Sequence, residues 1–154
     1  MKERWLRIGV LAGALFAINV VARLIARFGF DGTSEAEERT SLLMLATVGV
    51  VCAVLAFVWG RRYPVGRWLV DLGAAALGGL LLTIFVGPFI SATSPFGGGA
   101  GLFFSQIWLY AAFAGGGALI GFLIATALGQ DYKSRSLQRF AEARSAKPKR
   151  VIRR

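Results

Sequence analysis

Four long apolar runs alternate with short polar segments along the chain. Charged residues flank the runs and are rare inside them. A helix that crosses a bilayer needs about 20 predominantly apolar residues, and each run is long enough. The pattern therefore predicts an all-α, polytopic membrane protein in which four transmembrane helices form a compact bundle. We place these helices at residues 6–28, 41–60, 68–90 and 102–128.

Two regions follow from this pattern, a transmembrane domain over residues 1–130 and a basic tail over residues 131–154. The basic start of the first run and its uncharged core ending at Ala22 also resemble a signal peptide. However, Arg23 follows directly, and the helical pattern continues to Phe28. We therefore expect the first run to be a retained helix, with cleavage as the alternative.

Small residues recur at every fourth position in three of the four runs. On a helix this spacing places them on one face. Such a smooth face lets two backbones approach closely, which is a main source of helix association in lipid. We expect these three seams to pack against other helices, in the manner of a glycine zipper. They are Gly9, Gly13 and Ala17 (first seam), Ala75, Gly79, Thr83 and Gly87 (second seam), and Gly117, Gly121, Ala125 and Gly129 (third seam).

The composition supports a membrane location. Hydrophobic residues make up 56% of the 154 residues and charged residues 17%, with a mean hydropathy of +0.62, whereas soluble domains average about 45–50% and 25%. The formal net charge is nevertheless +10. Because the basic residues gather at the ends of the apolar runs, they indicate membrane topology and not a nucleic-acid partner.

The positions of Lys and Arg predict which segments face the cytoplasm, because these residues resist translocation. Three lie in the N-terminal segment, three in the second connection and nine in the tail, whereas the third connection has none. The first connection also has three, but Arg23 and Arg27 lie within the helix end. We expect a multi-pass protein of the plasma membrane with both termini in the cytoplasm. The third connection, with its glycines at 97–99 and 101, is then an external surface loop or a re-entrant segment.

Three polar residues of the first run form a candidate functional site. Asn19, Arg23 and Arg27 recur at every fourth position, so they share one helix face. The guanidinium groups could bind a lipid phosphate or a partner's carboxylate. Alternatively, they reach the interface or pair with acids of the segment 35–38. Asn19 lies deep in the run and should seek a hydrogen bond from another helix.

Asp71 is the acidic residue closest to an apolar run. Carboxylates inside membranes often mark proton pathways. Arg67 lies one turn earlier, so a local Arg67–Asp71 pair is the simpler interpretation, and the one that we expect. The consecutive acids of the segment 35–38 could hold a divalent cation, but they lack the spacing of a calcium loop.

The remaining basic residues are expected to contact anionic headgroups on the cytoplasmic side. Leu137 and Phe140 share a helical face between basic residues of the tail, so part of the tail should lie on the membrane. Binding of RNA is the alternative, but no recognition motif supports it. The expected headgroup contacts are Arg61, Arg62, Arg67, Lys133, Arg135, Arg139 and Arg144.

The sequence favours no catalytic chemistry. It contains no histidine and one cysteine, Cys52, so the usual acid–base, metal and nucleophilic sites lack candidates. We expect a non-enzymatic protein without metal or cofactor. Two functions remain: an accessory or scaffold subunit that packs its seams against another membrane protein or itself, and a small transporter or flippase-like lipid-handling protein.

Overall fold

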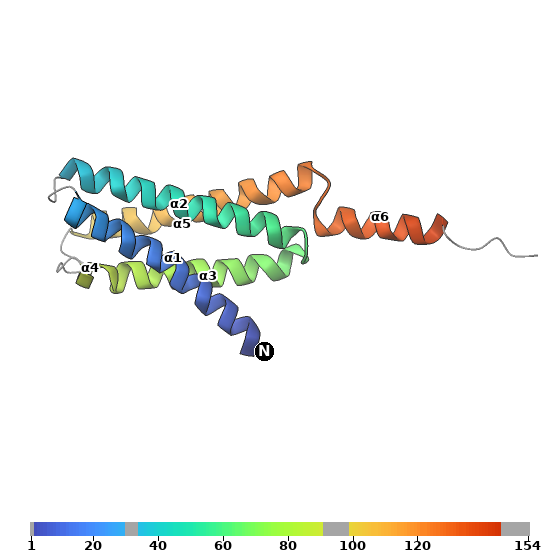
Figure 1. The fold of residues 1–154 in the computed structure, drawn as a ribbon, viewed down its shortest axis with the longest axis horizontal. Helices are drawn as coiled ribbons and strands as arrows, with labels where there is room; N and C mark the ends of the chain where they lie inside the picture. Colours follow the sequence, from blue (N-terminus) through green and yellow to red (C-terminus); the bar gives the residue numbers. More distant parts are fainter. Residues whose placement is uncertain (1, 30–33, 91–98, 146–154) are drawn as a thin grey trace, which may run out of the picture.

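The computed structural model describes residues 2–29, 34–90 and 99–145, and every regular element in these ranges is an α-helix (Figure 1). Four helices are long and apolar enough to cross a membrane. The predicted all-α fold with four spanning helices is therefore confirmed. The helices are α1 Lys2–Gly29, α2 Ser34–Gly60, α3 Val65–Phe85, α4 Gly87–Ile90, α5 Gly99–Ala127 and α6 Tyr132–Ser145.

Two helix boundaries differ from the predicted spans by five residues or more. α2 begins at Ser34 and not at residue 41, so the acidic segment 35–38 forms its first turns. The third predicted span is divided, because α3 ends at Phe85 and the short α4 begins at Gly87. Pro88 accounts for the break: its ring removes a backbone donor and collides with the preceding turn of a continuous helix.

The most extensive helix interface joins α2 to α5. At their crossing, Gly117 lies on Gly49 and Gly121 lies on Ala53, so closely that a Cβ at either α5 glycine would collide with the α2 backbone. Backbones approach to this degree only where side chains are absent or minimal. The first two residues of the third seam thus face a small-residue pair in α2.

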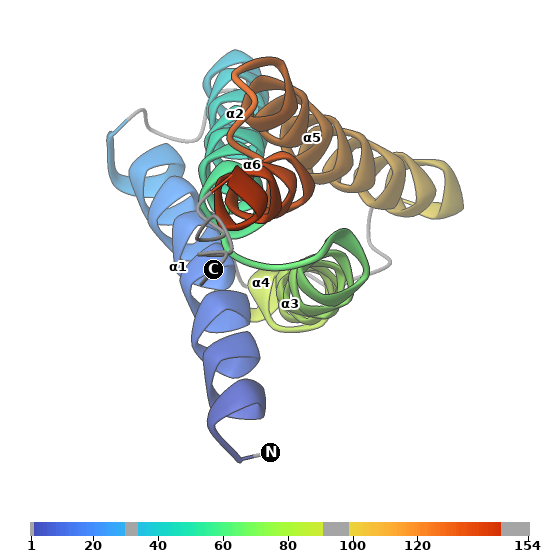
Figure 2. The ribbon, with the colours of Figure 1, turned by 90° about the vertical axis from the view of Figure 1, so that its right-hand side faces the viewer.

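The second interface joins α1 to α3, and it covers only part of α1. Both ribbon views show α1 crossing the bundle at an angle, with its first turns projecting away from the other helices (Figures 1 and 2). The first buried side chain of α1 is Ala12, whereas Trp5 and Val10 are more than half exposed. The N-terminal third of α1 therefore lies outside the packed core.

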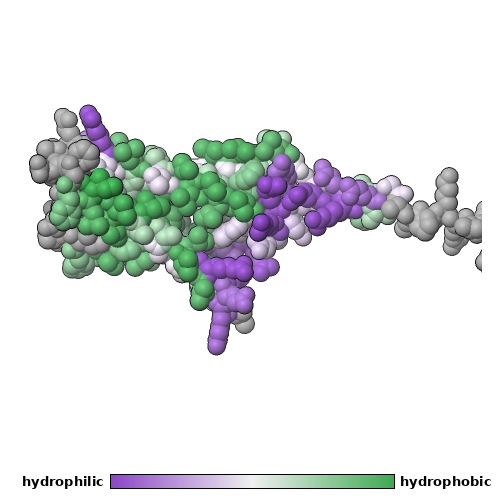
Figure 3. All heavy atoms as spheres, viewed as in Figure 1, coloured by the Kyte–Doolittle hydropathy of each residue, from purple (hydrophilic) through white to green (hydrophobic). Residues whose placement is uncertain are grey.

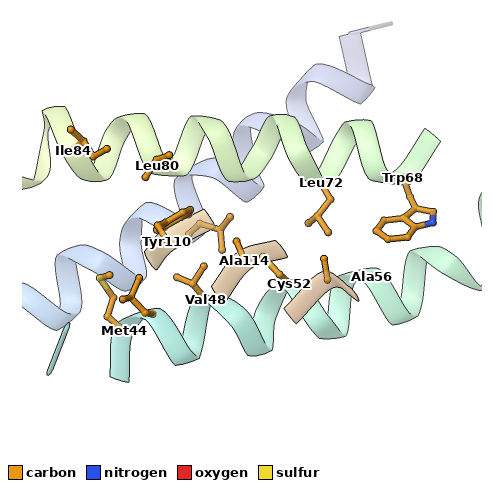
Figure 4. Packing of buried hydrophobic residues seen from close by; sticks show 13 residues of the cluster. Met44, Val48, Cys52, Ala56, Trp68, Leu72, Leu80, Ile84, Tyr110 and Ala114 are labelled. Carbon is orange, nitrogen blue, oxygen red and sulfur yellow. The ribbon is translucent and has the colours of Figure 1, made fainter. Parts of the chain in front are cut away.

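The core is a narrow band of side chains between α1, α2, α3 and α5. Leu15, Val48 and Cys52 are almost completely buried. Figure 4 shows Val48 and Cys52 of α2 pointing toward Tyr110 and Ala114 of α5. Large apolar side chains outside this band cover the outer surface of the helices, which is hydrophobic along most of the bundle (Figure 3). A bundle of this kind suits lipid as its surroundings, because lipid tails solvate such a surface.

A compact joint links α5 to α6. Gly129 has φ of +61°, and the amides of Gly129 and Gln130 donate to the carbonyls of Thr126 and Ala125 at 2.9 Å each. This is a Schellman motif, which ends a helix at a left-handed residue. Gly129 therefore terminates α5, and no atom lies within 4 Å of a Cβ built there. α6 then extends away from the bundle along its long axis (Figures 1 and 2), which differs from the in-plane tail that the sequence pattern predicts.

Candidate functional site

Polar side chains gather at two places near opposite ends of the bundle. One end of the bundle contains the start of α1, the turn between α2 and α3, and the joint between α5 and α6. We call this the basic end. Hydrophilic residues are concentrated there in the space-filling view (Figure 3). The second place lies toward the opposite end, around Asn19 of α1.

Asn19 connects α1 to α2 in the bundle interior. Its side chain is 2% exposed. The Nδ2 group donates to Sδ of Met44 at 2.8 Å, and Oδ1 accepts from Nε of Arg23 at 3.0 Å. The hydrogen bond to another helix, expected from the depth of Asn19, is therefore present, although its acceptor is a thioether, which is a weak one.

Because Gly87 has no side chain, it leaves room for the side chains of Asn19 and Arg23. A Cβ at Gly87 would lie 3.1 Å from both Nε of Arg23 and Oδ1 of Asn19. Gly87, the last residue of the second seam, thus faces an arginine side chain and not the closely packed backbone of another helix. The side chain of Arg27 lies outside the described residues, as do those of Glu35 and Glu37, so the predicted three-residue stripe is described only for Asn19 and Arg23.

The seam residues occupy different environments. In the second seam, Ala75 and Thr83 are buried, and a Cβ at Gly79 would lie 2.9 Å from the Tyr110 hydroxyl. In the third seam, Ala125 is fully buried. In the first seam, by contrast, all three residues are exposed, and no atom lies within 4 Å of a Cβ built at Gly9 or Gly13.

Asp71 pairs with a different arginine from the one predicted. Its Oδ1 accepts from Nε of Arg4 at 2.7 Å and lies 2.5 Å from the same guanidinium group's Nη2. The guanidinium carbon of Arg67 instead lies 5.5 Å from the centre of the Tyr63 ring. The predicted Arg67–Asp71 pair is therefore wrong: the angled course of α1 brings Arg4 to Asp71, while Arg67 packs back against the turn.

A cavity of about 280 Å³ lies beside this ion pair at the basic end. The start of α1 forms one wall, and the end of α2, the following turn and the start of α3 form the other. Charged and aromatic side chains therefore meet in one place. The lining residues are Glu3, Arg4, Arg7, Ile8, Trp59, Tyr63, Arg67, Trp68 and Asp71.

The basic residues expected to meet anionic headgroups lie on the outside of the described structure. Arg62 and Arg67 are exposed at the turn between α2 and α3, and Arg61 packs its guanidinium carbon 5.3 Å from the centre of the Phe57 ring. The four predicted contacts in α6 are all exposed. Arg61 and Arg67 thus combine charge with an aromatic partner at the basic end.

Two features of this arrangement were missed by sequence reasoning. The α2 partner of the third seam is Gly49 and Ala53, whose spacing of four could have revealed it. The contact of Arg4 with Asp71 carries no local signal, because 67 residues separate the two.

Comparison with protein-family models, curated proteins and solved structures found no match. Within the described ranges, no group of three or more His, Cys, Asp or Glu residues is placed to hold a metal ion.

Proposed function

We propose that the protein is an accessory or scaffold subunit of a larger membrane complex or of a homo-oligomer, and that another transmembrane helix packs against the first seam. The observation that carries this proposal is the open space beside Gly9 and Gly13. The matching glycines of the third seam are covered closely by α2. The first seam offers the same kind of face without a cover.

The α2–α5 crossing indicates what kind of helix would fit. There, two small residues four positions apart meet two others with the same spacing, Gly49 and Ala53 against Gly117 and Gly121. The occupant proposed for the first seam is therefore a transmembrane helix that carries its own small residues at this spacing. α1 of a second copy meets this requirement, as does a suitable helix of another subunit.

The orientation belongs to the same proposal. We place the basic end in the cytoplasm and the protein in the plasma membrane, because the turn at Arg61 and Arg62 and the tail are rich in residues that resist translocation. Trp59, Tyr63 and Trp68 at the same end suit the aromatic belt of a membrane interface. Anionic headgroups are the natural counterions of this surface.

The alternative is a small transporter or a flippase-like lipid-handling protein. The Asn19–Arg23 group would have to contact the cargo, yet Asn19 already uses its amide on Met44 and its carbonyl on Arg23. The α1–α3 interface is also tightly packed between the two polar places, since a Cβ at Gly78 would lie 3.0 Å from that of Ala12. These contacts favour the scaffold function.

The alternative has its own test. If Arg23 and Arg27 hold a lipid or a partner's acid, replacing both by glutamine should reduce the co-purified lipid or partner measured by native mass spectrometry. Equal occupancy in the wild type and the double variant would remove this role.

The scaffold proposal is tested by filling the first seam. Gly13→Leu places a large side chain where the chain itself has no neighbouring atom, so the monomer should keep its thermal stability. Gly73→Leu is the matched control, because Gly73 of α3 is equally open and exposed. Native mass spectrometry in mild detergent should show a stoichiometric oligomer or complex for the wild type and Gly73→Leu, and its loss in Gly13→Leu.

A crosslink identifies the partner more directly. With Cys52 replaced by alanine, Ala17→Cys should form a disulfide between two copies if α1 meets α1. A stoichiometric heteromeric complex without this crosslink would identify another subunit. A monomeric wild type in native membranes would contradict the proposal.

A further inference from the structure

The cavity at the basic end combines features that the scaffold function does not use. Its walls carry three arginines, two acids, three aromatic rings and one isoleucine. Trp and Tyr prefer the level of the lipid headgroups, so the cavity would lie at the membrane interface. Its volume of about 280 Å³ is close to the lower end of the range for small-molecule pockets.

The charges of the cavity leave two arginines available. Arg4 is neutralised by Asp71, and this pair ties the start of α1 to α3. Arg7 and Arg67 are both exposed, and neither forms an ion pair within the described residues. Glu3 is the remaining acid of the lining. Because guanidinium groups bind phosphate oxygens bidentately, Arg7 and Arg67 are suited to an anion held between α1 and α3.

Trp68 adds an unused hydrogen-bond donor. Its side chain is 3% exposed, and its Nε1 has no hydrogen-bond partner. The ring packs against Phe122 with 5.6 Å between the ring centroids. Figure 4 shows the indole nitrogen on the side of the ring away from Leu72, toward the basic end. A buried N–H without an acceptor is unfavourable, so an acceptor brought by a ligand would stabilise this side chain.

We propose that this cavity binds the phosphate group of a membrane-lipid headgroup. Arg7 and Arg67 contact the phosphate oxygens from opposite walls, and the N–H of Trp68 donates to an oxygen at the inner end. The Arg4–Asp71 pair holds the two walls together. The apolar chains of the lipid then extend along the hydrophobic outer surface of the bundle.

The test compares variants that lose equal charge at different places. The protein is purified in detergent, and binding of added phosphatidylglycerol is titrated by native mass spectrometry. Arg7→Gln with Arg67→Gln should weaken the first binding event by about tenfold or more, since hydrogen bonds to charged groups are strong. Lys2→Gln with Arg39→Gln is the matched control, because both residues are exposed and neither lines the cavity, and it should retain wild-type affinity.

Trp68→Phe provides the second arm, because it removes the N–H and keeps an aromatic ring. This variant should also bind phosphatidylglycerol more weakly, while the matched variant Trp108→Phe, in an exposed residue of α5, should not. Thermal unfolding without added lipid controls for damage to the fold. Equal weakening in the Arg7/Arg67 variant and the Lys2/Arg39 variant would show general charge attraction and would overturn the site.

Titration with inorganic phosphate distinguishes the source of the ligand. Binding of one phosphatidylglycerol per chain that millimolar phosphate does not displace supports a lipid headgroup. If phosphate binds with the same dependence on Arg7, Arg67 and Trp68 and excludes lipid, the ligand is a soluble phosphate compound and the lipid assignment is wrong. Failure of both ligands to bind would overturn the proposal, and it would leave the α1 interface untouched.

Discussion

Gly121 of α5 lies directly against the backbone of Ala53 in α2, with no space for a side chain between the two helices. A Cβ at Gly121 would be 2.8 Å from Cα of Ala53 and closer still to its carbonyl oxygen. Because the backbone atoms of Ala53 belong to a helix, they cannot move aside independently. The spacing of α2 and α5 therefore depends on the absence of a side chain at this position.

Gly121→Leu should destabilise the protein by about 1–3 kcal/mol or more, the range typical of overpacked sites. Thermal unfolding in detergent measures the effect. Gly115→Leu is the matched control, because Gly115 on the same helix is exposed and has no atom within 4 Å of a Cβ. Leu123→Ala removes an exposed side chain and should also cost less than Gly121→Leu. An unchanged melting profile for Gly121→Leu would show that α2 and α5 do not cross here.

The Arg4–Asp71 pair should contribute only modestly to stability. Its side chains are 48% and 17% exposed, and exposed ion pairs typically contribute about 0–1 kcal/mol. A double-mutant cycle with Arg4→Gln and Asp71→Asn should therefore show a small favourable coupling. The same cycle with Arg67→Gln should show none. A larger coupling for Arg67 would restore the local pair and contradict the observed path of α1.

Asp131 should make the start of α6 sensitive to acid. Hydrogen bonds from Ser134 lower the pKa of the Asp131 carboxyl below its ordinary value, and the Ser134 amide donates to Oδ2 at 3.3 Å. Because the folded-state pKa is lowered, this stabilisation is present at neutral pH and is lost as the pH falls below about 4.

Hydrogen exchange of the Ser134 amide measures this dependence. Asp131→Ala should accelerate exchange at neutral pH, since loss of an N-cap costs about 1 kcal/mol. The variant should also remove the acid-dependent change expected for the wild type. Glu142→Gln, which changes another acid of α6, is the control and should preserve that change.

Cysteine labelling tests the orientation of the basic end. In a Cys52→Ala background, a membrane-impermeant thiol reagent applied from outside should modify a probe at Ser94 and spare probes at Tyr63 and Ser145. The reason is the concentration of Lys and Arg around the latter two positions. Labelling in the reverse pattern would place the basic end outside.

The sequence predicts the spanning helices well because the requirement that defines them is local. Each helix must cover the apolar thickness of the bilayer with its own residues, and this length is visible in each run. The partner of each face is not encoded locally. Spacing marks Gly13 and Gly121 alike as members of smooth faces, yet the structure covers Gly121 and leaves Gly13 open.

The polar groups also have some features that the local sequence predicts and others that depend on how the helices pack. The depth of Asn19 predicts a hydrogen bond to another helix, but not that Met44 accepts it. Asp71 could be paired from sequence only with a neighbour in the same helix, because the approach of Arg4 depends on the crossing angle of α1 and α3. The cavity at the basic end follows from that same angle and was therefore not predictable.

The joint between α5 and α6 determines how the tail can act. Gly129 ends α5 and Asp131 caps α6, so only a few residues separate the two helices. Backbone hydrogen bonds hold these residues to the end of α5, and the Asp131 side chain holds them to the start of α6. With 14 residues, α6 is a rod of about 21 Å at 1.5 Å per residue. Any molecule that binds its far end would be held at a set distance from the bundle, as by a spacer, and a rotation of α5 would move that molecule with it.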